Sequence, residues 1–80
     1  MISYIVIIQD DESGVRLKEM KFDDRNAALN YMKKVEEVFQ RKGYVVEWEE
    51  DVEDRFTAVS SKNPLLRFNV FMIQVIKIGK

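Results

Sequence analysis

The chain has 80 residues, of which 46% are hydrophobic and 34% are charged, and its formal net charge is −1. This length suffices for one domain, 1–80, and the near-neutral charge argues against a polybasic nucleic-acid binder. The lack of cysteine and histidine excludes disulfides, thiol chemistry, zinc–thiolate sites and the usual general base near neutral pH. We therefore expect a small globular protein with no cofactor and no enzymatic activity.

The start of the chain predicts a β-hairpin. Met1–Gln9 is rich in β-branched and aromatic residues, which is typical of a strand. Asp10–Gly14 supplies the turn, and Val15–Phe22 alternates as the return strand. The apolar alternation of the return strand shifts partway along, which suggests a bulge near Lys18-Glu19 or a turn of its last residues toward the next element.

The segment that follows has the periodicity of an amphipathic helix. Asp23 or Asp24 suits the N-cap, and Gly43 suits the left-handed position after the last turn. Between them, apolar residues recur at spacings of three and four and so share one face: Ala28, Tyr31, Met32, Val35, Val38 and Phe39.

The second half of the chain predicts three more strands. Tyr44–Glu49 alternates between apolar and polar residues, Asp51–Asp54 forms an acidic connection, and Arg55–Ser60 is a short strand. After a turn at residues 60–64, Leu65–Ile78 favours a final strand. Asn63-Pro64 offers the alternative of a helix start.

The element order β-β-α-β-β-β predicts an α+β fold. We expect a largely antiparallel four- or five-stranded sheet with one helix packed on one face. No internal repeat or linker divides the chain, and no stretch reaches the roughly 18 apolar residues of a membrane span. The apolar N-terminal run lacks a basic region before it, so we do not expect a signal peptide.

The first and last strands are apolar on both faces, which one helix cannot cover. If these strands are neighbours, five large side chains gather on the face away from the helix: Ile5, Ile7, Phe71, Ile73 and Val75. Soluble monomers rarely expose such patches. We expect a homodimer, formed by packing of two sheets or exchange of the C-terminal strand. The alternatives are a barrel-like sheet that covers itself and a different partner protein.

The densest run of charge is acidic: Glu47, Glu49, Glu50, Asp51, Glu53 and Asp54. One interpretation is a solvated strand edge and loop, and the other is a surface that docks a basic partner. A calcium loop is disfavoured because the run has no central glycine. Trp48 lies within it but shares its alternation with Tyr44 and Val46, which favours a core tryptophan over an exposed binding residue.

The helix also carries basic residues, which offer a second hypothesis. They are Arg25, Lys33, Lys34, Arg41 and Lys42, and they are interrupted by Glu36 and Glu37. Phosphate contact is one interpretation, and a solvated helix face is the other.

We therefore expect a non-catalytic protein-interaction module, a small homodimeric regulator or inhibitor that binds another macromolecule. Its size suggests a bacterial or phage source, and its lack of cysteine fits the cytoplasm. The expected binding surface is the acidic segment, with the hairpin tip at Asp10–Glu12 as an additional contact. The alternatives are a nucleic-acid-binding protein that uses the helix cations, and an enzyme subunit that completes a site on another chain. We expect no membrane contact.

Overall fold

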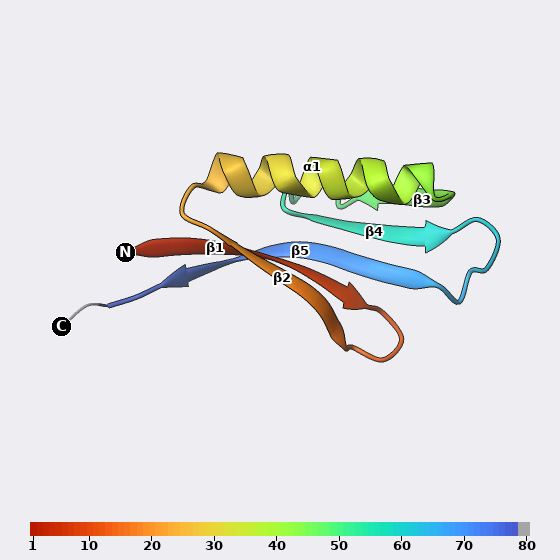
Figure 1. Cartoon of the computed structure of the whole chain (residues 1–80), viewed down its shortest axis with the longest axis horizontal. Coiled ribbons are helices and arrows are strands. Elements are labelled where there is room, and N and C mark those ends of the chain that lie inside the picture. The colour runs from red at the N-terminus through yellow and green to blue at the C-terminus, as the bar shows by residue number, and fades with distance from the viewer. Residues whose placement is uncertain (79–80) are drawn as a thin grey trace.

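A computed structural model describes residues 1–78 as one helix lying across one face of a five-stranded sheet (Figure 1). The elements are β1 (Ile2–Asp10), β2 (Arg16–Phe22), α1 (Arg25–Arg41), β3 (Tyr44–Trp48), β4 (Arg55–Ser60) and β5 (Arg67–Ile76). The strands lie in the order β2-β1-β5-β4-β3, and each neighbouring pair is antiparallel. The predicted α+β fold and the order of its elements are confirmed.

Local chemistry at both ends of α1 sets its limits. Asp24 is the N-cap, and its carboxylate accepts a hydrogen bond of 3.1 Å from the Ala27 N–H. After the last turn, Gly43 adopts φ +88°, a backbone angle that other residues rarely tolerate. The Gly43 carbonyl then accepts a 2.7 Å hydrogen bond from the Ser61 hydroxyl, which ties this end of the helix to the turn after β4.

The core lies between α1 and the sheet. Its largest fully buried side chains include Met32 from the helix, Phe56 from β4 and Val70 from β5. Burying a side chain of this size contributes about 1.5–3 kcal/mol. The complete buried cluster is Val6, Ala28, Met32, Val35, Phe56, Ala58, Val70 and Met72.

Strand β2 contains the bulge that the sequence suggested, but at a different residue. Lys18 pairs with Ile8 and Arg16 pairs with Gln9, so Leu17 is the extra residue in this strand. The bulge therefore lies one residue before the predicted Lys18-Glu19. A bulge strengthens the local twist, and the β1–β2 hairpin tip bends away from the helix in Figure 1.

The final strand begins later than predicted. Residues 61–66 connect β4 to β5, and in this turn the Leu66 N–H donates to the Asn63 carbonyl at 2.9 Å and the Leu65 N–H donates to the Asn63 side chain at 3.1 Å. The alternative of a helix starting at Asn63-Pro64 is wrong, because the chain enters β5 directly at Arg67.

The face of the sheet away from α1 holds the side chains predicted there. Ile5 pairs with Ile73 and Ile7 pairs with Phe71, so these residues share that face, with Val75 one pair further along. This face is less open than the sequence suggested. Ile7 has 0% of its surface exposed, and the other four residues are half-buried.

Long polar side chains account for part of this cover. The Arg55 guanidinium lies 5.6 Å from the centre of the Phe71 ring, a distance typical of a cation–π contact. On the neighbouring strand, Arg16 and Glu19 form an ion pair of 2.9 Å. Glu19 pairs with Ile7 across the sheet, so this ion pair lies on the same face beside it.

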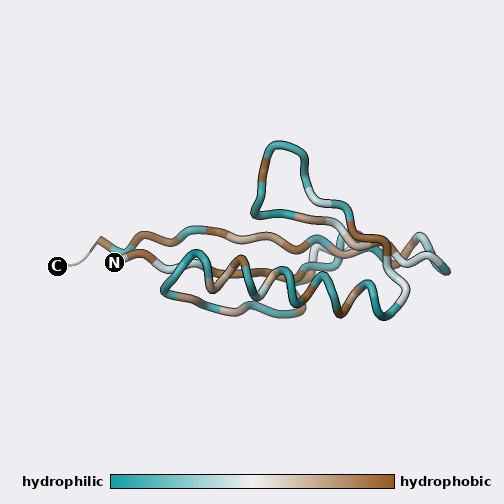
Figure 2. Tube along the Cα trace, turned by 90° about the horizontal axis from the view of Figure 1, so that it is seen from above, coloured by the Kyte–Doolittle hydropathy of each residue, from teal (hydrophilic) through white to brown (hydrophobic). Residues whose placement is uncertain are grey.

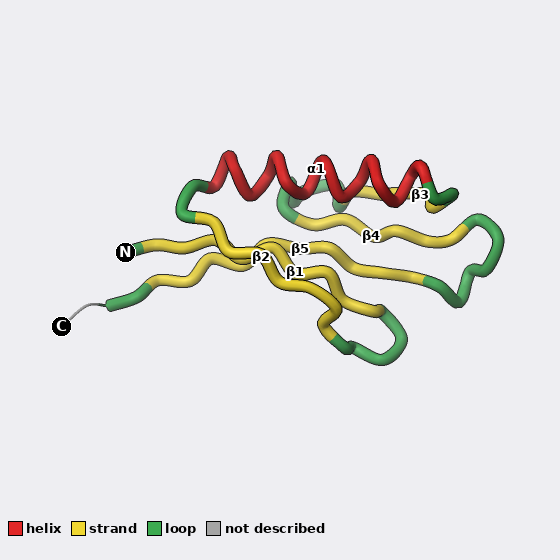
Figure 3. Tube along the Cα trace, in the orientation of Figure 1, coloured by secondary structure: helices red, strands yellow, loops and turns green. Residues whose placement is uncertain are grey.

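The molecule is elongated, with extents of 50 × 24 × 21 Å. At one end, the start of β1 and the end of β5 continue past the first turn of α1 (Figure 3). Within residues 1–78, no helix is long and apolar enough to cross a membrane.

Candidate functional site

The acidic segment forms the connection between β3 and β4. It is closed at its base by a hydrogen bond of 3.1 Å from the Glu49 N–H to the Arg55 carbonyl. Figure 2 shows this connection as a largely hydrophilic loop that projects from the side of the molecule. Its carboxylates repel one another and are strongly hydrated, which keeps the loop in solvent.

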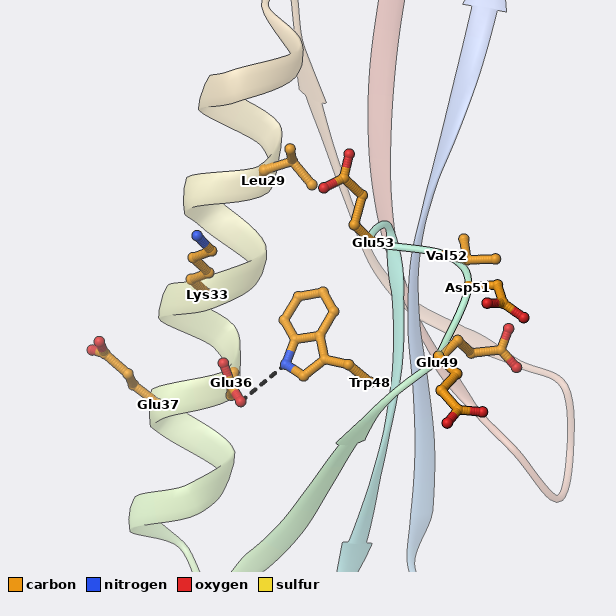
Figure 4. Close-up of a pocket in the computed structure, with 10 residues that line it drawn as sticks. Leu29, Lys33, Glu36, Glu37, Trp48, Glu49, Asp51, Val52 and Glu53 are labelled. Carbon is orange, nitrogen blue, oxygen red and sulfur yellow. Dashed lines mark hydrogen bonds between the residues drawn. The ribbon is translucent and has the colours of Figure 1, made fainter.

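Trp48 anchors this loop to the rest of the fold. Its indole ring is half-buried and packs against Phe56, with ring centroids 4.7 Å apart. The indole N–H donates a hydrogen bond of 3.0 Å to Glu36 of α1 (Figure 4). The predicted packing of Trp48 beside the helix is confirmed, and the same ring also lines a groove.

That groove lies between α1 and the acidic loop and has a volume of about 740 Å³. Trp48, Leu29 and Val52 give it an apolar lining (Figure 4). Its other lining residues are Lys33, Glu36, Glu37, Glu49, Glu50, Asp51 and Glu53. Six carboxylates against one lysine give this lining a formal charge of −5, whereas the whole chain carries −1.

A second hollow, of about 880 Å³, lies on the other side of the same loop. Trp48–Val52 line both hollows, and the second one extends along the strands past Val45, Glu47 and Thr57 to Arg67. This hollow has a more balanced charge, because Arg67 offsets part of its acidity. The loop is therefore accessible from two sides, and the groove against α1 is the more acidic of the two.

The predicted acidic residues separate into three groups. Glu49, Glu50 and Asp51 line both hollows, while Glu53 lines only the groove and Glu47 only the second hollow. Asp54 lines neither hollow. Its carbonyl accepts a 3.0 Å hydrogen bond from the Met72 N–H at the edge of β5.

Three helix residues of the groove, Leu29, Glu36 and Glu37, were not predicted to belong to a binding surface, and Lys33 was predicted only as a phosphate contact. Leu29, Lys33 and Glu37 follow one another at intervals of four, so they form a row along α1. Glu36 adds the hydrogen bond to Trp48. The spacing of four residues, which places these side chains in one row, could be seen in the sequence. Nothing in the sequence indicated that the β3–β4 loop lies against this row.

The groove has no geometry for a metal ion. Among residues 1–78, no group of three or more carboxylates converges closely enough to hold one. At one end, Arg25 donates to Glu53 at 3.3 Å, an exposed pair that links the first turn of α1 to the loop. Carboxylates spread along a groove attract cationic groups over its whole length and provide no single coordination point.

The basic helix residues do not form one surface. Arg25 pairs with Glu53, and Arg41 lies 3.9 Å from Glu37. Lys33 lines the acidic groove, Lys34 is exposed elsewhere on the helix, and Lys42 is exposed just after its end. This arrangement gives no continuous cationic track for a phosphate backbone.

The hairpin tip at Asp10–Glu12 lies at the opposite edge of the sheet from the groove. Asp10 accepts hydrogen bonds from the Ser13 hydroxyl at 2.6 Å and from the Ser13 N–H at 3.0 Å. These bonds hold the pKa of the Asp10 carboxyl below its usual value. Asp11 accepts a 2.6 Å hydrogen bond from the Asn69 side chain, so both carboxylates already serve the local structure.

Comparisons with protein-family models, with curated proteins and with solved structures find no significant match to this chain.

Proposed function

We propose that this protein is a non-catalytic interaction module, a small regulator or inhibitor that binds a basic segment of another protein. The carrying observation is the groove between α1 and the β3–β4 loop, whose lining has a formal charge of −5 around an apolar floor. Lysine and arginine side chains complement both features, because their aliphatic stems pack on apolar surface while their charged ends meet carboxylates.

Trp48 favours a cationic ligand further. An indole face attracts ammonium and guanidinium groups, and aromatic residues are common at the centre of binding surfaces. The hydrogen bond to Glu36 holds the indole in a fixed orientation, so little side-chain freedom is lost on binding.

The proposal includes a homodimer and a cytoplasmic setting. An 80-residue chain has a small core, and association adds buried apolar area to it. The lack of cysteine suits a reducing compartment.

The test uses Trp48, the single tryptophan of the chain, as a fluorescent reporter. An oligo-arginine peptide, which has no aromatic residue, is titrated into the protein at low salt. We expect a saturable change in tryptophan emission and an affinity that falls as salt is added, since the attraction between exposed charges is screened.

Charge reversal then locates the site. The triple substitution Glu49→Lys, Glu50→Lys and Asp51→Lys should abolish peptide binding and leave the circular dichroism spectrum unchanged. A matched pair compares Glu50→Lys with Asp23→Lys, which changes the net charge equally at an exposed position outside the groove. Only Glu50→Lys should weaken binding. Equal binding by the triple variant and the original protein would remove the groove from consideration.

A further inference from the structure

The end of β5 has an open edge. The last pairs between β5 and β4 join Phe71 to Arg55, and the Met72 N–H then donates to the Asp54 carbonyl at 3.0 Å. Strand β5 continues to Ile76, with β1 paired on its other side as far as Ile2. Among residues 1–78, no strand pairs with β5 on this side beyond that point.

The backbone groups on this edge have a defined direction. The Met72 N–H points toward β4, and the Lys77 N–H points toward β1, where it donates to the Met1 carbonyl at 2.9 Å. Backbone groups alternate along a strand, so those of Gln74 and Ile76 point to the open edge. Both residues thus present a donor and an acceptor for a further strand.

The outer strand β2 is protected against edge-to-edge pairing, and the end of β5 is not. The outer strand β2 carries Arg16, Lys18, Glu19 and Lys21 and is bent by a bulge, features that oppose edge-to-edge pairing. The other outer strand, β3, carries Glu47 and leads into the acidic loop. Residues 74–78 of the overhang contain one polar residue, Gln74, and one charged residue, Lys77, and the other three are apolar.

This overhang is also poorly supported in a single copy. Only β1 and β5 form it, because β2 ends at Phe22 opposite Tyr4. Ile2 is 43% exposed and Ile76 is 63% exposed. A two-stranded ribbon is marginally stable in water, and an exposed apolar edge tends to recruit another strand.

We infer that two copies of this chain pair through this edge, β5 against β5, antiparallel about a two-fold axis at Val75. With the axis there, Gln74 of each copy lies opposite Ile76 of the other, and both exchange N–H and carbonyl hydrogen bonds. Under this rotation the donors and acceptors of the edge face the acceptors and donors of the same edge in the other copy. The partner we infer for this edge is therefore a second copy of the chain. The two sheets then join at their overhanging ends, with the two-fold axis perpendicular to the sheet and both helices on the same face.

This inference rests on the homodimer of the proposed function and concerns only its geometry. The two Val75 side chains would form a non-hydrogen-bonded pair, whose Cα atoms in antiparallel sheets lie about 4.5 Å apart. That separation suits a disulfide. Because the chain has no cysteine, Val75→Cys introduces a single reporter.

The experiment measures disulfide formation under mild oxidation on a non-reducing gel. Val45→Cys, at an exposed position on β3, is the matched control. We expect Val75→Cys to form covalent dimers about tenfold faster or more, since pairing raises the effective concentration of the two thiols. Gln74→Pro removes an outward N–H without breaking a bond within one copy, and it should return the solution mass to 9.5 kDa with an unchanged circular dichroism spectrum.

Light scattering separates the outcomes. A mass of twice 9.5 kDa together with rapid Val75→Cys cross-linking supports the inference. A dimer in which Val75→Cys reacts no faster than Val45→Cys overturns this geometry and leaves the homodimer to another surface. A mass of 9.5 kDa at all concentrations overturns both the geometry and the homodimer, while peptide binding in the groove is tested independently.

Discussion

Asp10 and Trp48 illustrate how single side chains position the surfaces of this protein. Asp10 closes the hairpin turn by accepting two hydrogen bonds from Ser13. Trp48, at the end of β3, is joined to α1 by its hydrogen bond to Glu36 and to β4 by its aromatic contact with Phe56. In both residues a polar group, the Asp10 carboxylate or the Trp48 indole N–H, makes a hydrogen bond that holds the side chain in place.

The Asp10 turn predicts a pH effect. The pKa of Asp10 is lower in the folded state than its usual 3.8, mainly because of the Ser13 hydroxyl. A carboxyl whose pKa is lower in the folded state than in the unfolded state stabilises the fold fully at pH values above its unfolded-state pKa. This contribution is lost as the pH falls through its folded-state pKa. Acidification below about pH 4 should therefore loosen the hairpin tip.

Removal of the hydroxyl tests this effect. In Ser13→Ala the pKa of Asp10 should rise toward 3.8, because the backbone hydrogen bond is the main contact that remains. Titration of the carboxyl carbon by NMR measures it directly. Ser61→Ala, at the far turn, is the control and should leave the Asp10 pKa where it is. An unshifted Asp10 in Ser13→Ala would show that the hydroxyl is not the cause.

At the scale of elements, α1 is both a cover for the core and one wall of the groove. Its buried face holds Ala28, Met32 and Val35, while Leu29, Lys33 and Glu37 form the adjacent row that lines the groove. The start and end of the helix therefore set the alignment of that row with the β3–β4 loop.

The N-cap provides a measurable test of the helix limits. Asp24→Ala removes the acceptor for the Ala27 N–H and should lower the free energy of unfolding by about 1 kcal/mol. Asp23→Ala, one residue earlier and exposed, should change it much less, because Asp23 does not cap the helix. Chemical denaturation of both variants gives the comparison. If both variants lost the same free energy of unfolding, the effect would come from the removed charge and not from the loss of the cap.

At the scale of the whole molecule, the sheet encloses side chains on both of its faces. The helix covers one face, and Ile7 is completely buried on the other. Arg55 over Phe71 and the Arg16–Glu19 pair show that charged side chains help to close this second face. The overhanging end of β1 and β5 is one of the places where large apolar side chains stay exposed, among them Ile2 and Ile76.

The burial of Ile7 predicts a large loss of stability on truncation. Ile7→Ala should lower the free energy of unfolding by about 2–5 kcal/mol, the range for a fully buried aliphatic side chain. Leu65→Ala removes a side chain that is 73% exposed and should change it by less than about 0.5 kcal/mol. A small effect of Ile7→Ala would mean that this face is open in solution.

The sequence by itself determined the elements and the faces of this protein. Alternation along the strands separated Ile5 and Ile7 from Tyr4 and Val6, and the spacing of apolar residues predicted α1 with a cap at Asp23 or Asp24, of which Asp24 is the cap. These are local properties, set by the repeat of two residues in a strand and 3.6 in a helix, so they can be obtained without knowing which elements meet.

Only the tertiary structure decided which elements meet and what they enclose. The order β2-β1-β5-β4-β3 places the β3–β4 loop beside α1, joins Trp48 to Glu36 and leaves the end of β5 without a neighbour. The exact position of the bulge at Leu17 and the start of β5 at Arg67 likewise depend on strand register. Pairing between distant segments depends on the combined packing of the whole chain, which no local pattern records.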